Sequence, residues 1–196
     1  MIKLPISKLV KPIVLILGLH GFMMSCNTEN EDDYTPCPQP TETGEIVTIS
    51  TDEAHVYTSI IIDATPNQVW EVLTDFETMP NWSTTFQGLE GDIEQDGQIN
   101  AIFPLPNGEL FHYPHALIYS EQEYYGWSDE IVTLPGIVDN HLYKVEYCES
   151  QTLFIQTEEF KGNNANLPAI GLANGVLEGY QTFNKELKAE VEKRFN

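Results

Sequence analysis

Positive charge is scarce in this chain of 196 residues. Nine residues are Lys or Arg against 30 Asp or Glu, which gives a formal net charge of −21 at pH 7. No basic patch occurs along the chain except near the N-terminus, where three of the nine lie: Lys3, Lys8 and Lys11. Phosphate backbones and anionic headgroups are bound by clustered Lys and Arg. The composition therefore excludes nucleic acid as a partner and argues against membrane binding through surface charge.

Cysteine is also scarce, and the common catalytic and metal-binding motifs are missing. The three cysteines form no CxxC pair and no Cys/His spacing typical of zinc sites, and no GxSxG motif is present. His112 and His115 lack the further ligands that a metal site needs, so we expect neither a metal nor a cofactor. In an exported protein Cys37 and Cys148 are free to pair, but the sequence does not decide whether they do.

The longest apolar stretch lies at the N-terminus and is too short to cross a bilayer. It follows the three lysines, covers residues 13–24 and ends at Ser25-Cys26. A positive start, a short apolar run and a small residue at its end predict a secretory signal peptide over residues 1–25. Because a Cys follows directly, the segment resembles a bacterial lipoprotein signal, and the resemblance implies lipidation at Cys26. An ordinary cleaved signal with an incidental Cys is the alternative.

The next segment, residues 26–52, is rich in acidic residues, Thr and Pro. Such a composition cannot bury enough apolar surface to fold, and it predicts a disordered tether that can be removed without loss of the fold. Residues 53–196 then form one domain of ordinary size, which we expect to be monomeric. The lipid anchor would attach it to the bacterial cell envelope, at the outer membrane. Exposure on the cell surface is a further hypothesis, which rests on the acidic tether.

The domain begins with a strand and two short helices. β-branched and apolar residues over 56–63 predict the strand, and Thr65-Pro66 then has the N-cap and first-turn residues of a helix. Residues 75–82 are typical of a second short helix, which we expect Pro80 to end.

Strand-length apolar runs occupy the middle of the domain, and one long helix ends it. The apolar residues from Val176 to Phe195 recur every three or four positions, which predicts an amphipathic helix. Asn107-Gly108 favours a hairpin, and the close spacing of the runs favours antiparallel neighbours. The predicted strands cover residues 89–93, 98–105, 110–119, 124–134, 137–148 and 152–161.

This order of elements resembles the START-like, or SRPBCC, superfamily, which includes polyketide cyclase/dehydrase-like proteins. The motifs that carry the resemblance span residues 60–76, 79–82, 134–136, 158–162 and 179–187. The resemblance implies an α+β, helix-grip fold, in which a curved antiparallel sheet wraps around the long C-terminal helix and leaves a deep apolar cavity. It implies no particular activity, because folds of this kind host many functions.

The last predicted strand has the most informative side chains. Alternation places Phe154, Gln156, Glu158 and Phe160 on one face, and the two Phe residues indicate that this face is turned inward. A carboxyl group on an apolar wall has a raised pKa and acts as a neutral hydrogen-bonding acid. A purely structural pairing of Glu158 is the alternative.

The neighbouring strand places His141 and Tyr143 on one face. A His beside an inward Glu binds a polar ligand group or moves a proton, although a histidine satisfied within the core is the alternative. The sequence does not decide which face of residues 110–119 or 124–134 is turned inward. The predicted ligand-binding residues are Trp127, His141, Tyr143, Phe154, Gln156, Glu158, Phe160, Tyr180 and Phe183.

Three functions are compatible with these residues. The first is binding of a small hydrophobic or amphipathic molecule, for which apolar walls supply affinity and a few polar groups set the orientation. The second is a cyclase or dehydratase that uses a buried Glu and a His, with catalytic residues that the sequence does not identify. The third is an interaction module whose core is filled.

Overall fold

The computed structural model describes residues 35–164 and 167–195. The predicted signal peptide, residues 1–25, and the predicted lipidation site, Cys26, lie outside these ranges. None of the helices in the described part of the chain combines the length and the apolar character that crossing a bilayer requires.

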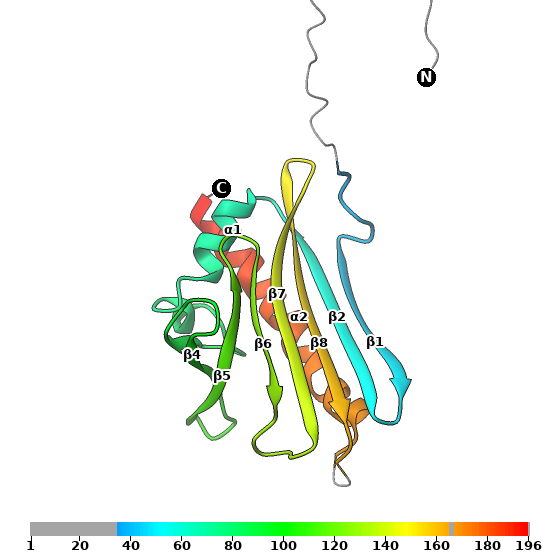
Figure 1. Ribbon diagram of the computed structural model, residues 1–196. Coiled ribbons are helices and arrows are strands. Elements are labelled where there is room, and N and C mark those ends of the chain that lie inside the picture. Colours follow the sequence, from blue (N-terminus) through cyan, green and yellow to red (C-terminus); the bar gives the residue numbers. More distant parts are fainter. Residues whose placement is uncertain (1–34, 165–166, 196) are drawn as a thin grey trace, which may run out of the picture. The chain divides into compact units, whose positions relative to one another are not determined.

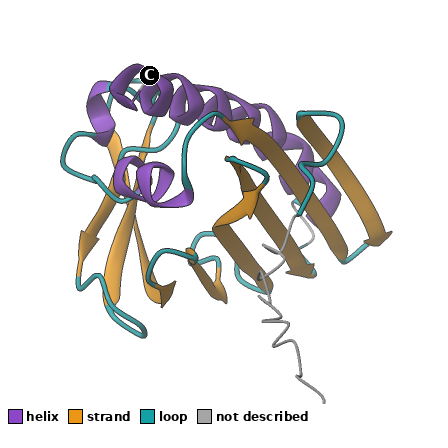
Figure 2. Ribbon diagram, turned by 90° about the horizontal axis from the view of Figure 1, so that it is seen from above, coloured by secondary structure: helices purple, strands orange, loops and turns teal. Residues whose placement is uncertain are grey.

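Eight strands form one antiparallel sheet in the order β1-β2-β8-β7-β6-β5-β4-β3 (Figure 1). The sheet curves around the C-terminal helix α2, so the predicted helix-grip fold is confirmed (Figure 2). The predicted strand over 124–134 is shorter than expected, because β6 ends at Glu130 before a loop. The strands are β1 (Glu42–Ser50), β2 (Glu53–Ile62), β3 (Gly88–Gly91), β4 (Gln98–Pro104), β5 (Leu110–Ser120), β6 (Tyr124–Glu130), β7 (Ile137–Cys148) and β8 (Gln151–Gly162).

Helix α1 starts where its capping residues predict, whereas the second predicted helix needs a correction. Helix α1 (Pro66–Leu73) has a capping box: Thr65 Oγ1 accepts from the Gln68 backbone N–H, and the Gln68 side chain accepts from the Thr65 N–H. The predicted second helix over 75–82 is only a 3₁₀ turn, Met79–Asn81. Pro80 lies inside this turn and does not end it, because the first turn of a helix needs no N–H donor there.

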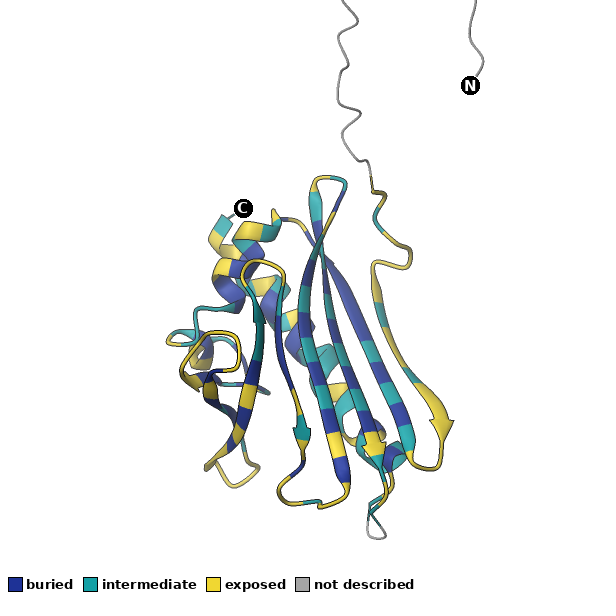
Figure 3. Cartoon of the chain, viewed as in Figure 1, coloured by how far each residue is buried: buried dark blue, intermediate teal, exposed yellow. Residues whose placement is uncertain are grey.

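Helix α2 (Ala169–Phe195) is longer than the apolar repeat that predicts it. It crosses the concave side of the sheet, and its buried side chains include Phe183, Leu187 and Val191. The sheet presents the alternate, inward residues of β7 and β8 to it (Figure 3). The core of the domain therefore lies between α2 and the sheet.

The prediction of a disordered tether over 26–52 is wrong in its second half. Strand β1 pairs with β2 from Glu42 to Ser50 and forms the edge of the sheet. All its side chains are exposed or half-buried (Figure 3), and of its apolar residues Ile46 packs against the core, so backbone hydrogen bonds to β2 hold it in place more than apolar burial does. Its composition therefore resembles that of a linker although its structure does not.

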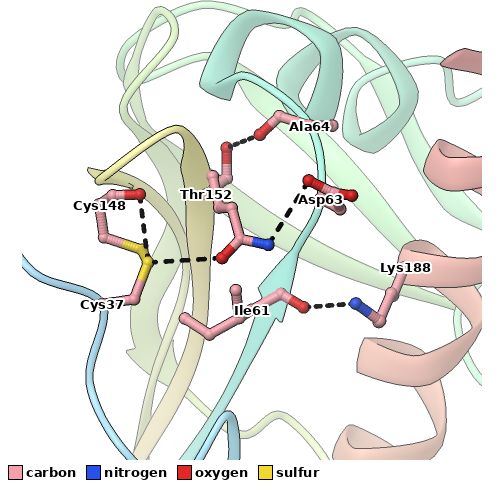
Figure 4. The surroundings of a disulfide bond; sticks show 8 residues. Cys37, Ile61, Asp63, Ala64, Cys148, Thr152 and Lys188 are labelled. Carbon is pink, nitrogen blue, oxygen red and sulfur yellow. Dashed lines mark hydrogen bonds between the residues drawn. A yellow bond between two sulfur atoms is a disulfide. The ribbon is translucent and has the colours of Figure 1, made fainter. Parts of the chain in front are cut away.

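A disulfide also ties this segment to the domain. Cys37 is bonded to Cys148 at the end of β7, across a sequence separation of 111 residues (Figure 4). Nearby, Thr152 Oγ1 donates a hydrogen bond to the Ala64 carbonyl over 2.8 Å, and Lys188 Nζ donates to the Ile61 carbonyl over 2.7 Å. The pairing that the sequence left open is thus present.

Candidate functional site

A cavity of about 370 Å³ lies between the sheet and α2. Its walls come mainly from β4 to β8, from the loop after β6 and from α2. Leu105 and Phe111 are exposed, and Leu134, Leu172 and Val176 are only half-buried. These five residues form an apolar rim at the end of the domain where β7 begins. The disulfide lies at the opposite end of β7.

Eight of the nine predicted ligand-binding residues line this cavity. They are Trp127, His141, Tyr143, Gln156, Glu158, Phe160, Tyr180 and Phe183. The ninth, Phe154, does not line it. Its ring lies deeper in the core, with centroids 6.3 Å from Tyr143 and 6.2 Å from Phe183. It shares the inward face of β8, but the packed rings separate it from the cavity.

Glu158 is the centre of a buried polar cluster. Its Oε2 accepts a hydrogen bond from the Tyr180 hydroxyl over 2.7 Å and lies 2.7 Å from His141 Nδ1. The Gln156 amide nitrogen lies 3.2 Å from the other ring nitrogen of His141. The register produces this cluster, because His141 is directly opposite Glu158 on the neighbouring strand. These contacts fit a neutral imidazole with its hydrogen on Nδ1.

Asp139 belongs to the same cluster and was missed by the sequence analysis. It lies two residues before His141 on the inward face of β7 and lines the cavity. Its carboxyl group is close enough to that of Glu158 for a hydrogen bond when one of the two carries a proton. The sequence does contain a signal for Asp139, because the alternation that predicts an inward position for His141 and Tyr143 also applies to it.

Burial controls the ionisation of this cluster. It raises the pKa of Glu158 from 4.5 to about 7. Burial, together with the neighbouring Glu158 charge, raises the pKa of Asp139 from 3.8 to about 9. Burial also lowers the pKa of His141 to about 4, so the imidazole is uncharged at neutral pH. The cluster thus retains protons on its carboxyl groups in a pH range where ordinary carboxyl groups have released them.

A stack of rings supports the cluster from β5 and β6. The Trp127 indole lies between His115 and His141, with ring centroids 4.6 Å and 4.7 Å away. His115 Nδ1 in turn lies 2.7 Å from Asp129 Oδ1. His115 is buried whereas His112 is exposed, which settles the inward face of β5. No group of three or more His, Cys, Asp or Glu among the described residues is arranged to hold a metal ion.

Residues 53–192 match the model of a family described as polyketide cyclase / dehydrase and lipid transport, a range that begins at β2 and leaves β1 outside. No curated protein sequence matches this chain.

Several solved structures share the fold. The Zhui aromatase/cyclase from Streptomyces sp. R1128 is 15% identical with a TM-score of 0.60, over 74% of this chain and 96% of that one. A START superfamily protein from Mycobacterium smegmatis is 16% identical with a TM-score of 0.55, over 71% and 98%. A conserved protein of unknown function from Enterococcus faecalis is 20% identical with a TM-score of 0.53, over 79% of each chain. Identities this low show the fold alone.

Proposed function

Because the chain belongs to the polyketide cyclase / dehydrase and lipid transport family, we propose that its cavity binds a small hydrophobic or amphipathic molecule. The superfamily that the sequence motifs resemble is supported by this match and by the START superfamily neighbour. The observation that carries the proposal is the cavity itself. Its volume of about 370 Å³ falls within the range of small-molecule sites, roughly 300–1,000 Å³.

The lining supports binding better than a surface role. Most of the side chains that face the cavity are apolar or aromatic, and the polar ones gather around Glu158. A module that acted only through its surface would have no need for an open space in its core, since unfilled volume lowers stability. The rim adds an apolar entrance, because Leu105 and Phe111 remain 39% and 38% exposed.

Two glycines of α2 allow a matched test of this function. Gly179 lines the cavity and Gly175 does not, and a Cβ at either position meets open space. We expect the Gly179→Phe variant to lose binding of the uncharged dye N-phenyl-1-naphthylamine, measured by fluorescence, because the new ring occupies the cavity. The Gly175→Phe variant controls for the change in the helix and should bind as the unaltered protein does. Equal binding by both variants would contradict the proposal.

We propose further that the domain is attached to the outer membrane through a lipid on Cys26. The sequence before Cys26 supports this, because a positive start and a short apolar run precede the cysteine. Membrane fractionation tests the attachment: the Cys26→Ser variant should leave the membrane fraction. If this variant stays there, or if the unaltered protein is recovered without lipid, the anchor proposal is wrong.

A second candidate, a cyclase or dehydratase, is favoured by one observation. Asp139, Glu158, His141 and Tyr180 place exchangeable protons on the wall of the cavity, as general acid–base catalysis requires. Mass spectrometry of co-purified small molecules separates the two functions. An enzyme would retain one compound in the Glu158→Gln variant that the unaltered protein converts into another. A binding protein would retain the same compound in both, or lose it in the variant.

A further inference from the structure

We propose that the ligand of this cavity has a protonated amine as its head group, held between the carboxyl groups of Asp139 and Glu158. This inference rests on the proposed function, because it specifies the chemistry of the molecule that the same cavity binds. It follows from three features of the lining: oxygen atoms without donors, an absence of positive side chains and a surrounding set of aromatic rings.

Three buried oxygens belong to side chains that line the cavity and lack a donor other than a carboxyl proton. Asp139 Oδ1, Gln156 Oε1 and Glu158 Oε1 accept no hydrogen bond from the described residues, apart from the proton that the Asp139 and Glu158 carboxyl groups can share. Their side chains line the cavity, and the three residues are 8%, 1% and 1% exposed. A buried polar atom without a partner costs about 1–3 kcal/mol, so a ligand that supplies hydrogen-bond donors here is favoured. A primary ammonium group has three N–H donors and no acceptor.

The charge of the lining selects a cation over an anion. Among the described residues that line the cavity, Asp139 and Glu158 are acidic and none is Lys or Arg. A carboxylate or phosphate head group would therefore meet two carboxyl groups and no counter-charge. An ammonium group would stabilise the ionised carboxylates that burial otherwise disfavours, and a proton would leave the pair to the solvent as the cation enters.

The rest of the cavity suits the body of such a molecule. Phe103, Tyr143, Phe183 and Tyr180 place aromatic rings around the same space. The electron-rich faces of such rings attract cations, by about 0.5–2 kcal/mol. A carboxyl pair next to aromatic rings is therefore a better environment for an amine on an aromatic or aliphatic body than for a fatty acid.

A matched series of probes tests the head group on the unaltered protein. The probes are 2-(1-naphthyl)ethylamine, 2-(1-naphthyl)ethanol and 1-naphthylacetate, which share one apolar body. Calorimetry at pH 7.5 and physiological salt should give the amine a dissociation constant at least about tenfold below that of the alcohol, with the carboxylate weakest. An amine that binds no tighter than the alcohol, or no tighter than the carboxylate, overturns the proposal.

Variants test whether the tighter binding of the amine comes from Asp139 and Glu158. Asp139→Asn and Glu158→Gln keep the shape of each side chain and remove its charge, so each should weaken amine binding about tenfold and alcohol binding less than about twofold. Glu159→Gln is the matched control, because Glu159 lies on the opposite face of β8 and is bound to Lys161. Loss of amine affinity in the control to the same extent would show attraction to the acidic surface and would also overturn the proposal.

The two proposals fail in different ways. If the alcohol binds and the amine has no advantage, the head-group proposal fails while the proposed function stands. If N-phenyl-1-naphthylamine and all three probes fail to bind, both the head-group proposal and the proposed function are wrong. The probe series needs only the unaltered chain, so it is decisive even where a variant does not fold. The Gly179→Phe variant must lose amine binding, because an amine that still binds to it is bound outside the cavity.

Discussion

Tyr180 donates its hydroxyl hydrogen to Glu158 Oε2 over 2.7 Å, which joins α2 to β8 at the wall of the cavity. His141 on β7 lies 2.7 Å from the same oxygen. One carboxyl oxygen thus connects the long helix with two neighbouring strands. The cluster that would orient a ligand is therefore also part of the packing that holds α2 on the sheet.

Removal of this hydroxyl should lower stability and change the titration of Glu158. In the Tyr180→Phe variant, Glu158 loses a hydrogen bond that lowers its pKa, so we expect the pKa of Glu158 to rise further above about 7. We expect the free energy of unfolding in urea to fall by about 1–2 kcal/mol. The Tyr147→Phe variant, at an exposed position, is the control and should match the unaltered protein. Equal stability of the two variants would show that the hydrogen bond contributes nothing.

The buried carboxyl groups should make the protein less stable as pH rises from 6.5 to 9. Their folded-state pKa values are raised, from 4.5 to about 7 for Glu158 and from 3.8 to about 9 for Asp139. The folded state then holds protons that the unfolded chain has released. The free energy of unfolding therefore falls as pH rises through these folded-state pKa values. The pKa values of His141 and His115 are lowered, so these residues make stability rise with pH, but only near and below pH 6.5.

Thermal unfolding measures this dependence. We expect the unfolding midpoint to be about 5 °C or more lower at pH 9 than at pH 6.5. The Asp139→Asn variant should have a flatter profile, whereas Glu159→Gln should keep the slope, since Glu159 is half-buried and its pKa is lowered by Lys161. A midpoint that rises with pH over this range would contradict the raised pKa values.

The disulfide should hold the N-terminal edge of the sheet in place. Replacing both cysteines, in the Cys37→Ser/Cys148→Ser variant, should lower the free energy of unfolding by about 2–4 kcal/mol, because the bond closes a long loop in the unfolded chain. Hydrogen exchange should become faster in β1, which is held by its backbone bonds to β2. A reducing agent should reproduce both effects in the unaltered protein and have none on the variant. Unchanged exchange in β1 would show that pairing with β2 suffices.

Gly126 should tolerate no side chain, because β6 and β7 approach closely beneath the cluster. A Cβ at this position would lie 1.9 Å from the His141 carbonyl oxygen. The Gly126→Ala variant must therefore displace the backbone of β7, and we expect a loss of about 2–3 kcal/mol in urea unfolding. Gly175→Ala is the control at an open position of α2, where Ala should raise stability by about 0.5–1 kcal/mol. Similar changes in both variants would contradict the close approach.

Local sequence patterns were enough to predict much of this domain's secondary structure and many of its inward-facing side chains. The alternation over β8 was enough to place Gln156, Glu158 and Phe160 inward, since side chains in a strand point to opposite faces in turn. Thr65 and Pro66 were enough to mark the start of α1, because capping depends on residues within one turn. The apolar repeat between Val176 and Phe195 was likewise enough to predict α2.

Relations between distant segments needed the tertiary structure. The acidic, Thr- and Pro-rich composition of residues 26–52 predicts a tether, because composition does not reveal the backbone hydrogen bonds that β1 makes with β2. Cys37 precedes β1, so its pairing with Cys148 depends on where β1 begins in the sheet. The separation of Phe154 from the cavity depends on the rings that pack between them. The sequence by itself determined which side chains of β7 and β8 are turned inward; only the folded chain decided that Asp139, His141, Glu158 and Tyr180 meet, because they come from two strands and a helix that are brought together by packing.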